Sequence, residues 1–137
     1  MPSLEDVRAI AAALPSSEER ATTSGAAWFV KNKLYAWEAY PWPSVAAEVR
    51  AVIESEAVFV VKVPTEEHKR AYLQGWPQVF LGQTTGWSEP KVALRLDAVE
   101  LDLLMELVTE AWFSQAPRYL QRAFDERQGN RKPDPTT

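Results

Sequence analysis

The chain has 137 residues, of which 46% are apolar and 11% aromatic, the size and composition of one domain with its own core. It contains no cysteine, so disulfides, thiolate catalysis and cysteine-ligated zinc are excluded. The net charge of -4 disfavours a general nucleic-acid binder, because such proteins draw most of their non-specific affinity from an excess of Lys and Arg.

The first part of the chain predicts a helix, a connection and a hairpin. Ser3 followed by Asp6 has the spacing of a capping box, and apolar residues at helical intervals predict a helix over 4–14. Residues 15–27 are rich in Ser, Thr, Glu and Ala and predict a solvated connection. The run WFVKNKLYAWEAY predicts two strands about a Lys31-Asn32-Lys33 turn, because Asn tolerates the left-handed conformation of a tight hairpin.

The middle of the chain predicts shorter elements. Residues 44–55 are ambiguous, and the spacing of their apolar side chains favours a short helix. The apolar run VFVVKV at 58–63 predicts a buried strand. Thr65 is placed to cap a helix that reaches about Gln74, and QVFLG predicts another short strand.

The last third predicts a strand followed by two helices. Val92, Leu94 and Leu96 alternate with polar or small residues, which indicates a strand with one buried face. Asp97 and Glu100 have capping-box spacing, so a helix is expected from about Ala98. Its predicted apolar side is made of Leu101, Leu104, Met105, Val108, Ala111 and Trp112. Its predicted solvated side carries Asp102, Glu106 and Glu110.

Pro117 fits the first turn of a separate second helix, where its missing N–H is no loss. Residues 126–137 are too polar to pack and are expected to form a disordered tail, which leaves 1–125 as a single domain. The fold class is therefore expected to be α+β, with two layers and an antiparallel sheet covered on one face by the N-terminal and C-terminal helices. With no apolar run of about 18 residues and with Glu5 and Asp6 in place of a basic signal region, we expect a cytoplasmic protein that does not contact membranes.

Motifs for catalysis are absent from the sequence. His68 is the single histidine, whereas a zinc site of the HExxH type needs a second one a turn away. There is no P-loop, no nucleophile elbow and no GxGxxG run. The paired acids stand in polar contexts that are typical of solvated surface. We therefore expect no enzyme activity, no metal and no cofactor.

One constellation of basic and aromatic residues points to binding. If Phe59, Val61 and Val63 face the helices, then Lys62, Lys91 and Arg95 point to the opposite face of the sheet. The hairpin would add Lys31, Lys33, Tyr35 and Trp37 to that face. Cations beside aromatic rings can hold phosphates and stack on unpaired bases, although lysines also protect open sheet edges and strand aromatics usually pack in cores.

The order of the predicted elements resembles that of the MmcQ/YjbR family of small bacterial proteins over roughly residues 4–124. The most specific match is the strand-to-helix passage VALRLDAVELDLLMELVTEAW, followed by Ala116-Pro117-Arg118-Tyr119-Leu120. The resemblance implies an α+β fold with a curved antiparallel sheet and helices on one side. It also implies DNA binding through two hairpin-like wings, and it brings no catalytic residues.

Two functions follow as expectations. The first is non-enzymatic DNA binding of the MmcQ/YjbR type through Lys31, Lys33, Lys62, Lys91 and Arg95, with Tyr35 and Trp37 beside them and Arg118 and Arg122 as secondary contacts. The alternative is a protein-interaction module or a homodimeric adaptor or chaperone-like domain. That alternative draws on Trp42, Trp76 and Trp87, which would form an apolar patch if they were exposed together.

Overall fold

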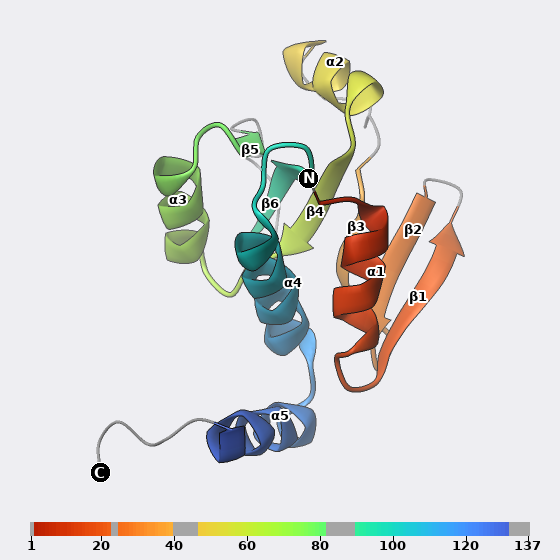
Figure 1. Ribbon diagram of the computed structural model, residues 1–137, viewed down its shortest axis with the longest axis vertical. Helices are drawn as coiled ribbons and strands as arrows, with labels where there is room; N and C mark the ends of the chain where they lie inside the picture. Colours follow the sequence, from red (N-terminus) through yellow and green to blue (C-terminus); the bar gives the residue numbers. More distant parts are fainter. Residues whose placement is uncertain (1, 23–24, 40–46, 82–89, 132–137) are drawn as a thin grey trace.

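The computed structural model describes residues 2–22, 25–39, 47–81 and 90–131. It contains a six-stranded antiparallel sheet with the strand order β1-β2-β3-β4-β6-β5 and helices at both ends of the chain (Figure 1). The elements are α1 (Leu4–Ala12), β1 (Ser17–Thr22), β2 (Gly25–Val30), β3 (Lys33–Glu38), α2 (Ala47–Ser55), β4 (Val58–Lys62), α3 (Glu66–Gly75), β5 (Phe80–Leu81), β6 (Lys91–Arg95), α4 (Leu101–Gln115) and α5 (Arg118–Arg131). The α+β prediction is confirmed, as are the hairpin, the two middle helices and the strands β4, β5 and β6.

The main core lies between one face of the sheet and the helices α1 and α4, which run across it in Figure 1. Val7 from α1 and Leu104 from α4 are fully buried there, together with Phe59 and Leu94 from the sheet. Trp112 is also fully buried, and its indole N–H donates to the Pro15 carbonyl at 2.9 Å. No helix in the described residues combines the length and the apolar character needed to cross a bilayer.

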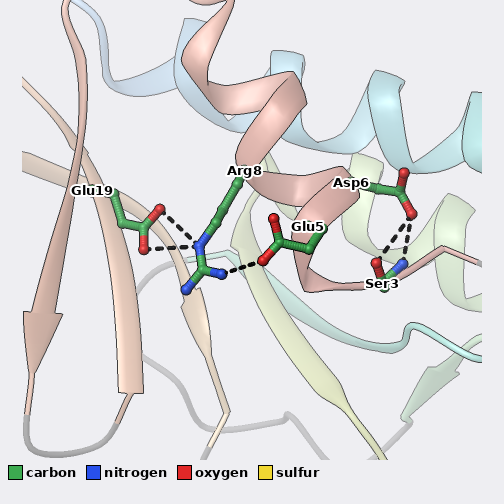
Figure 2. Close-up of polar contacts among 5 residues, drawn as sticks. All are labelled: Ser3, Glu5, Asp6, Arg8 and Glu19. Atoms are coloured by element: carbon green, nitrogen blue, oxygen red, sulfur yellow. Dashed lines mark hydrogen bonds and ion pairs between the residues drawn. The ribbon is translucent and has the colours of Figure 1, made fainter.

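Helix α1 begins with the contact that its sequence predicts and is joined to the sheet by an ion pair (Figure 2). The Asp6 carboxylate accepts from the Ser3 backbone N–H at 2.8 Å, which satisfies one of the donors left open at a helix start. Arg8 donates from Nε to both Glu19 oxygens at 3.1 and 3.2 Å and from a terminal nitrogen to Glu5 at 2.6 Å. The helix is thereby tied to β1.

The prediction of a solvated connection over 15–27 is wrong. Residues Ser17–Thr22 form the edge strand β1, and every residue of it pairs with β2 in a regular antiparallel register. The strand reads SEERAT, so it lacks the apolar alternation that indicates a strand. Its stability comes from its pairing with β2 and from the Arg8 contact to Glu19, neither of which leaves a local signal.

The predicted start of α4 is also wrong. Residues 96–99 form a turn in which the N–H groups of Ala98 and Val99 both donate to the Arg95 carbonyl at 3.1 Å, and the helix begins at Leu101. This turn places Val99 in the core, where it is 2% exposed. The helix is rotated relative to the predicted apolar side, because Leu107 is buried while Leu101 and Met105 are each 47% exposed.

The second C-terminal helix is present as expected and is longer than predicted. Helix α5 runs from Arg118 to Arg131, so it extends into the segment 126–137 that we expected to be a disordered tail. Residues 132–137 lie outside the described residues. The helix packs on the end of α4 through Phe124, whose ring centroid lies 5.2 Å from that of Trp112.

A smaller apolar cluster lies on the other face of the sheet. Val58, Val60 and Ala93 are buried there. They are covered by partly buried side chains from β3, the residue that follows it, α2 and β5, namely Trp37, Ala39, Val52, Ile53 and Leu81. The helix α2 therefore shields part of the face on which the sequence places the cations.

Candidate nucleic-acid interface

The side of the sheet that faces away from α1 and α4 carries the candidate site. We call it the reverse face and define it by Trp37, Val58, Val60, Lys62, Lys91, Ala93 and Arg95. Directly opposite residues of an antiparallel pair share a face. Lys62 lies opposite Lys91, and Val58 lies opposite Arg95. The intervening core residues, such as Val61 and Val92, are fully buried on the helical side, so β4 and β6 have the predicted alternation.

One end of this face brings two cations and an aromatic ring together. Lys62 and Lys91 stand directly opposite each other across β4 and β6. The Lys91 ammonium lies 5.6 Å from the centroid of the Trp37 ring, within the range of a cation–π contact. All three side chains are partly exposed. We call this group, Lys62, Lys91 and Trp37, the lysine end.

The other end of the reverse face is an ion pair. Arg95 donates from Nε to one Glu56 oxygen at 2.9 Å and from a terminal nitrogen to the other at 3.1 Å. A second contact runs from Arg95 to the Gln78 carbonyl at 3.4 Å. Because Arg95 and Lys91 are four residues apart on one strand, their backbones are about 13 Å apart. Lys62, Lys91 and Arg95 therefore share one face of the sheet, as predicted, but Arg95 lies at the other end of that face and is paired with Glu56.

Tyr35 does not lie on the reverse face. The β2–β3 register passes from Trp28 opposite Ala36 to Phe29 opposite Leu34, which leaves Tyr35 as an extra residue in β3. Such a β-bulge shifts the alternation of side chains. Tyr35 is fully buried in the main core, where its hydroxyl shares a hydrogen bond of 2.5 Å with Ser17. Burial raises the pKa of Tyr35 to about 12, and the Ser17 hydrogen bond opposes that rise.

The remaining predicted contacts are scattered. Lys31 lies in the two-residue hairpin turn, where its φ of 48° and the Asn32 φ of 68° give the left-handed backbone of a tight turn. Lys33 lies opposite Val30, which faces the main core, so Lys33 starts its strand on the helical side. Arg118 and Arg122 are exposed on α5, in the helical layer. None of these four belongs to the lysine end.

Sequence reasoning missed a further cation on the reverse side of the sheet. Arg20 of β1 lies opposite Ala27, which in turn lies opposite Trp37. Its guanidinium carbon is 4.3 Å from the centroid of the Phe29 ring, and it donates to Glu18 at 3.0 Å. The side chain was not found because residues 15–27 gave no strand pattern, so no face could be assigned to it.

The tryptophans and the acidic side chains were the other candidates for a functional site. Trp76 is 39% exposed, whereas Trp42 and Trp87, the other two residues of the predicted tryptophan patch, lie outside the described residues. Within the same residues there is no group of three or more His, Asp or Glu side chains arranged to hold a metal ion.

Comparison with known proteins places the chain among bacterial relatives. It is 34% identical over 128 residues to the uncharacterized proteins Rv2570 of Mycobacterium tuberculosis and Mb2600 of Mycobacterium bovis, covering 90% of this chain and 96% of each relative. The chain belongs to the family of these mycobacterial proteins. No family model matches it.

The family fold has a solved counterpart. The crystal structure of Deinococcus radiodurans protein DR2400, which contains a DUF419 domain, is similar with a TM-score of 0.65 and 18% sequence identity. The match covers 91% of this chain and 89% of DR2400. It agrees with the α+β sheet and the terminal helices of the chain and concerns the fold alone.

Proposed function

We propose that the chain is a non-enzymatic DNA-binding protein of the MmcQ/YjbR type and that it contacts DNA through the lysine end. The observation that carries this proposal is the pair formed by Lys62 and Lys91, directly opposite each other and beside Trp37. The fold similarity to a DUF419 domain, which belongs to the YjbR/MmcQ-like fold lineage, supports the family assignment. Arg95, Tyr35 and the hairpin lysines are no longer part of the proposed contact.

The chemistry of the lysine end suits one strand better than a duplex. Lys62 and Lys91 project from directly opposite positions on the same face, so one phosphate can contact both ammonium groups. An indole ring next to a bound phosphate can stack on an unpaired base, which is worth about 1–3 kcal/mol per base. A single-stranded segment offers such bases, whereas in a duplex they are paired and stacked.

The direct test is a titration of fluorescent oligonucleotides at about 50 and about 200 mM salt. Two phosphate contacts give slopes of log K against log salt of about -1.4 for a single strand and about -1.8 for a duplex. The fourfold rise in salt should then weaken single-strand binding about sevenfold and duplex binding about twelvefold. Single-stranded DNA should bind more tightly at both salt concentrations.

Matched variants distinguish the lysine end from general electrostatic attraction. The double variant Lys62→Gln with Lys91→Gln should lose most of the affinity and the salt dependence, and Trp37→Leu should reduce the preference for single strands. Lys31→Gln with Lys33→Gln removes the same charge at the hairpin and should change the affinity by less than about twofold. Equal losses in both double variants, or no binding at low salt, would contradict the proposal.

A further inference from the structure

A groove of about 440 Å³ lies along α4 and is closed at one side by Phe124 of α5, in the helical layer. Its lining combines apolar and acidic side chains: Met105, Glu106, Thr109, Glu110, Phe113 and Phe124. The groove is wide open to solvent. Such a shape leaves most of a small molecule exposed, whereas it can accept side chains that project from a helix.

The floor of the groove is held in place by packing. The Phe113 and Phe124 rings lie 6.3 Å apart, and both contact the buried Trp112 ring at 6.3 and 5.2 Å. Gln121 of α5 donates to the Phe113 carbonyl at 2.7 Å, which links the two helices. The apolar surface is therefore formed before any partner arrives, and binding would not require the floor to be ordered.

The wall of the groove is negatively charged. Glu106 and Glu110 both accept from the Tyr72 hydroxyl, at 3.1 and 3.0 Å. A phenol has one proton, so it satisfies one of these carboxylates at a time. Burial raises the pKa of Tyr72, and the two carboxylates raise it further. In the described part of the chain neither glutamate forms an ion pair, and α4 itself contains Asp102 and no Lys or Arg.

The apolar and acidic rows run side by side along α4. Leu101 and Met105, one turn apart and each 47% exposed, continue the apolar floor toward the start of the helix. Asp102, Glu106 and Glu110 repeat at the same interval beside them, so successive carboxylates are about 6 Å apart along the axis. A helix laid along α4 would present side chains at this same spacing.

We propose that the α4–α5 groove binds an amphipathic helix of a partner protein, with apolar side chains seated on Met105, Phe113 and Phe124 and with Lys or Arg along the flank that faces Glu106 and Glu110. The negative charge of the groove selects a basic partner, because the carboxylates of an acidic helix would be repelled by Glu106 and Glu110. Apolar anchors in a preformed groove would supply the affinity, and the charges would supply the selectivity.

The test uses two synthetic helical peptides of about 18 residues, one built of Leu and Lys and the other of Leu and Glu with the same apolar positions. Fluorescence anisotropy with the full chain should show binding of the Leu/Lys peptide and at least about tenfold weaker binding of the Leu/Glu peptide. Glu106→Gln with Glu110→Gln should weaken the Leu/Lys peptide at least about tenfold. Thr109→Trp, which fills the groove, should do the same.

The control is Glu66→Gln with Glu67→Gln, which removes the same charge from exposed positions at the start of α3 and should change peptide binding by less than about twofold. Circular dichroism verifies that every variant is folded. An equal loss in the control would overturn the proposal, because it would reveal attraction to overall negative charge.

A second measurement is sedimentation of the wild type and of the groove variants. If the wild type self-associates and the groove variants do not, the groove binds a second copy of the chain, and the proposal is overturned. Lys62→Gln with Lys91→Gln should leave peptide binding unchanged, so failure at the lysine end and failure at the groove are distinguishable.

Discussion

The β2–β3 hairpin and the β4–β6 pair are both antiparallel, but they differ in the regularity of their register. The β4–β6 register runs from Val58 to Lys62 without interruption. The β2–β3 register is broken once, by the extra residue Tyr35. Because of this break in the register, Tyr35 faces the core whereas Trp37, two positions later, lies on the reverse face. The site therefore depends on where alternation is interrupted as much as on which residues alternate.

The largest expected effect comes from the buried phenol of Tyr35. Its pKa is raised from 10.0 to about 12, so the folded state holds the proton more tightly than the unfolded state does. The stabilising contribution is complete below pH 10 and is lost as the pH rises from about 10 to about 12, by about 3 kcal/mol in total. Urea unfolding of the wild type and of Tyr35→Phe across this range should show that the variant lacks this part of the alkaline loss.

The matched control for this prediction is Ser17→Ala. Burial is the main cause of the raised pKa, and the Ser17 hydrogen bond opposes it. Removing the hydroxyl of Ser17 should therefore preserve or enlarge the alkaline loss of stability, even though one hydrogen bond worth about 1 kcal/mol is gone. If Ser17→Ala and Tyr35→Phe both abolished the loss, the hydrogen bond and not burial would be its origin.

A second prediction concerns the other end of the hairpin, at Gly25. Its φ of 122° is a conformation that side chains rarely adopt, and an added Cβ would meet the Glu38 carboxylate. That carboxylate accepts from the Ala26 N–H at 2.7 Å, so the clash would also displace a hydrogen bond between the two strands. Gly25→Ala should cost about 2 kcal/mol in the free energy of unfolding. Gly75→Ala, where nothing lies within 4 Å, should be neutral or slightly stabilising.

The two ends of the β4–β6 pair differ in charge: one carries the Arg95–Glu56 ion pair and the other carries two lysines. Substitutions that remove single charges test this difference. At the Arg95 end, Glu56→Gln should destabilise the fold by about 1 kcal/mol, the upper range for a partly exposed bidentate pair. A double-mutant cycle with Arg95→Gln should give a coupling of about 0.5–1 kcal/mol that decreases in high salt. A coupling near zero would mean that the ion pair is incidental and that Arg95 is available to other partners.

The sequence predicts the part of the site that depends on alternation alone. Residues 58–62 and 91–95 alternate without a break, so the faces of Lys62, Lys91 and Arg95 follow from a period of two. It does not predict the bulge at Tyr35, because a bulge is a property of the register between two strands. Nor does it reveal the partner of Arg95, since Glu56 lies 39 residues earlier and meets it through the fold.

The layers of the fold are predicted, whereas the edge strand β1, the start of α4 and the end of α5 are not. The apolar runs of β4 and β6 and the caps of α1 and α3 carry local signals, which is why these elements appear at the expected residues. The edge strand β1 has no apolar row to reveal it. The start of α4 is misplaced because a local signal is present and misleading. Asp97 could cap a helix, which is worth about 1 kcal/mol, but a helix that began there would not bury Val99 in the core. Burial of an apolar side chain is worth about 1.5–3 kcal/mol and therefore determines the structure.

The smallest expected effect is at the lysine end. Lys62 and Lys91 are like charges in directly opposite positions, and each also has an interaction of its own within the fold. Lys62→Gln and Lys91→Gln should therefore each change the free energy of unfolding by less than about 0.5 kcal/mol. Urea unfolding at two salt concentrations measures this directly, and a loss of about 1 kcal/mol or more in both single variants would show that the lysines support the sheet. If stability is unchanged, weaker binding of oligonucleotides by these variants reports lost phosphate contacts, because the sheet that presents the two side chains is intact.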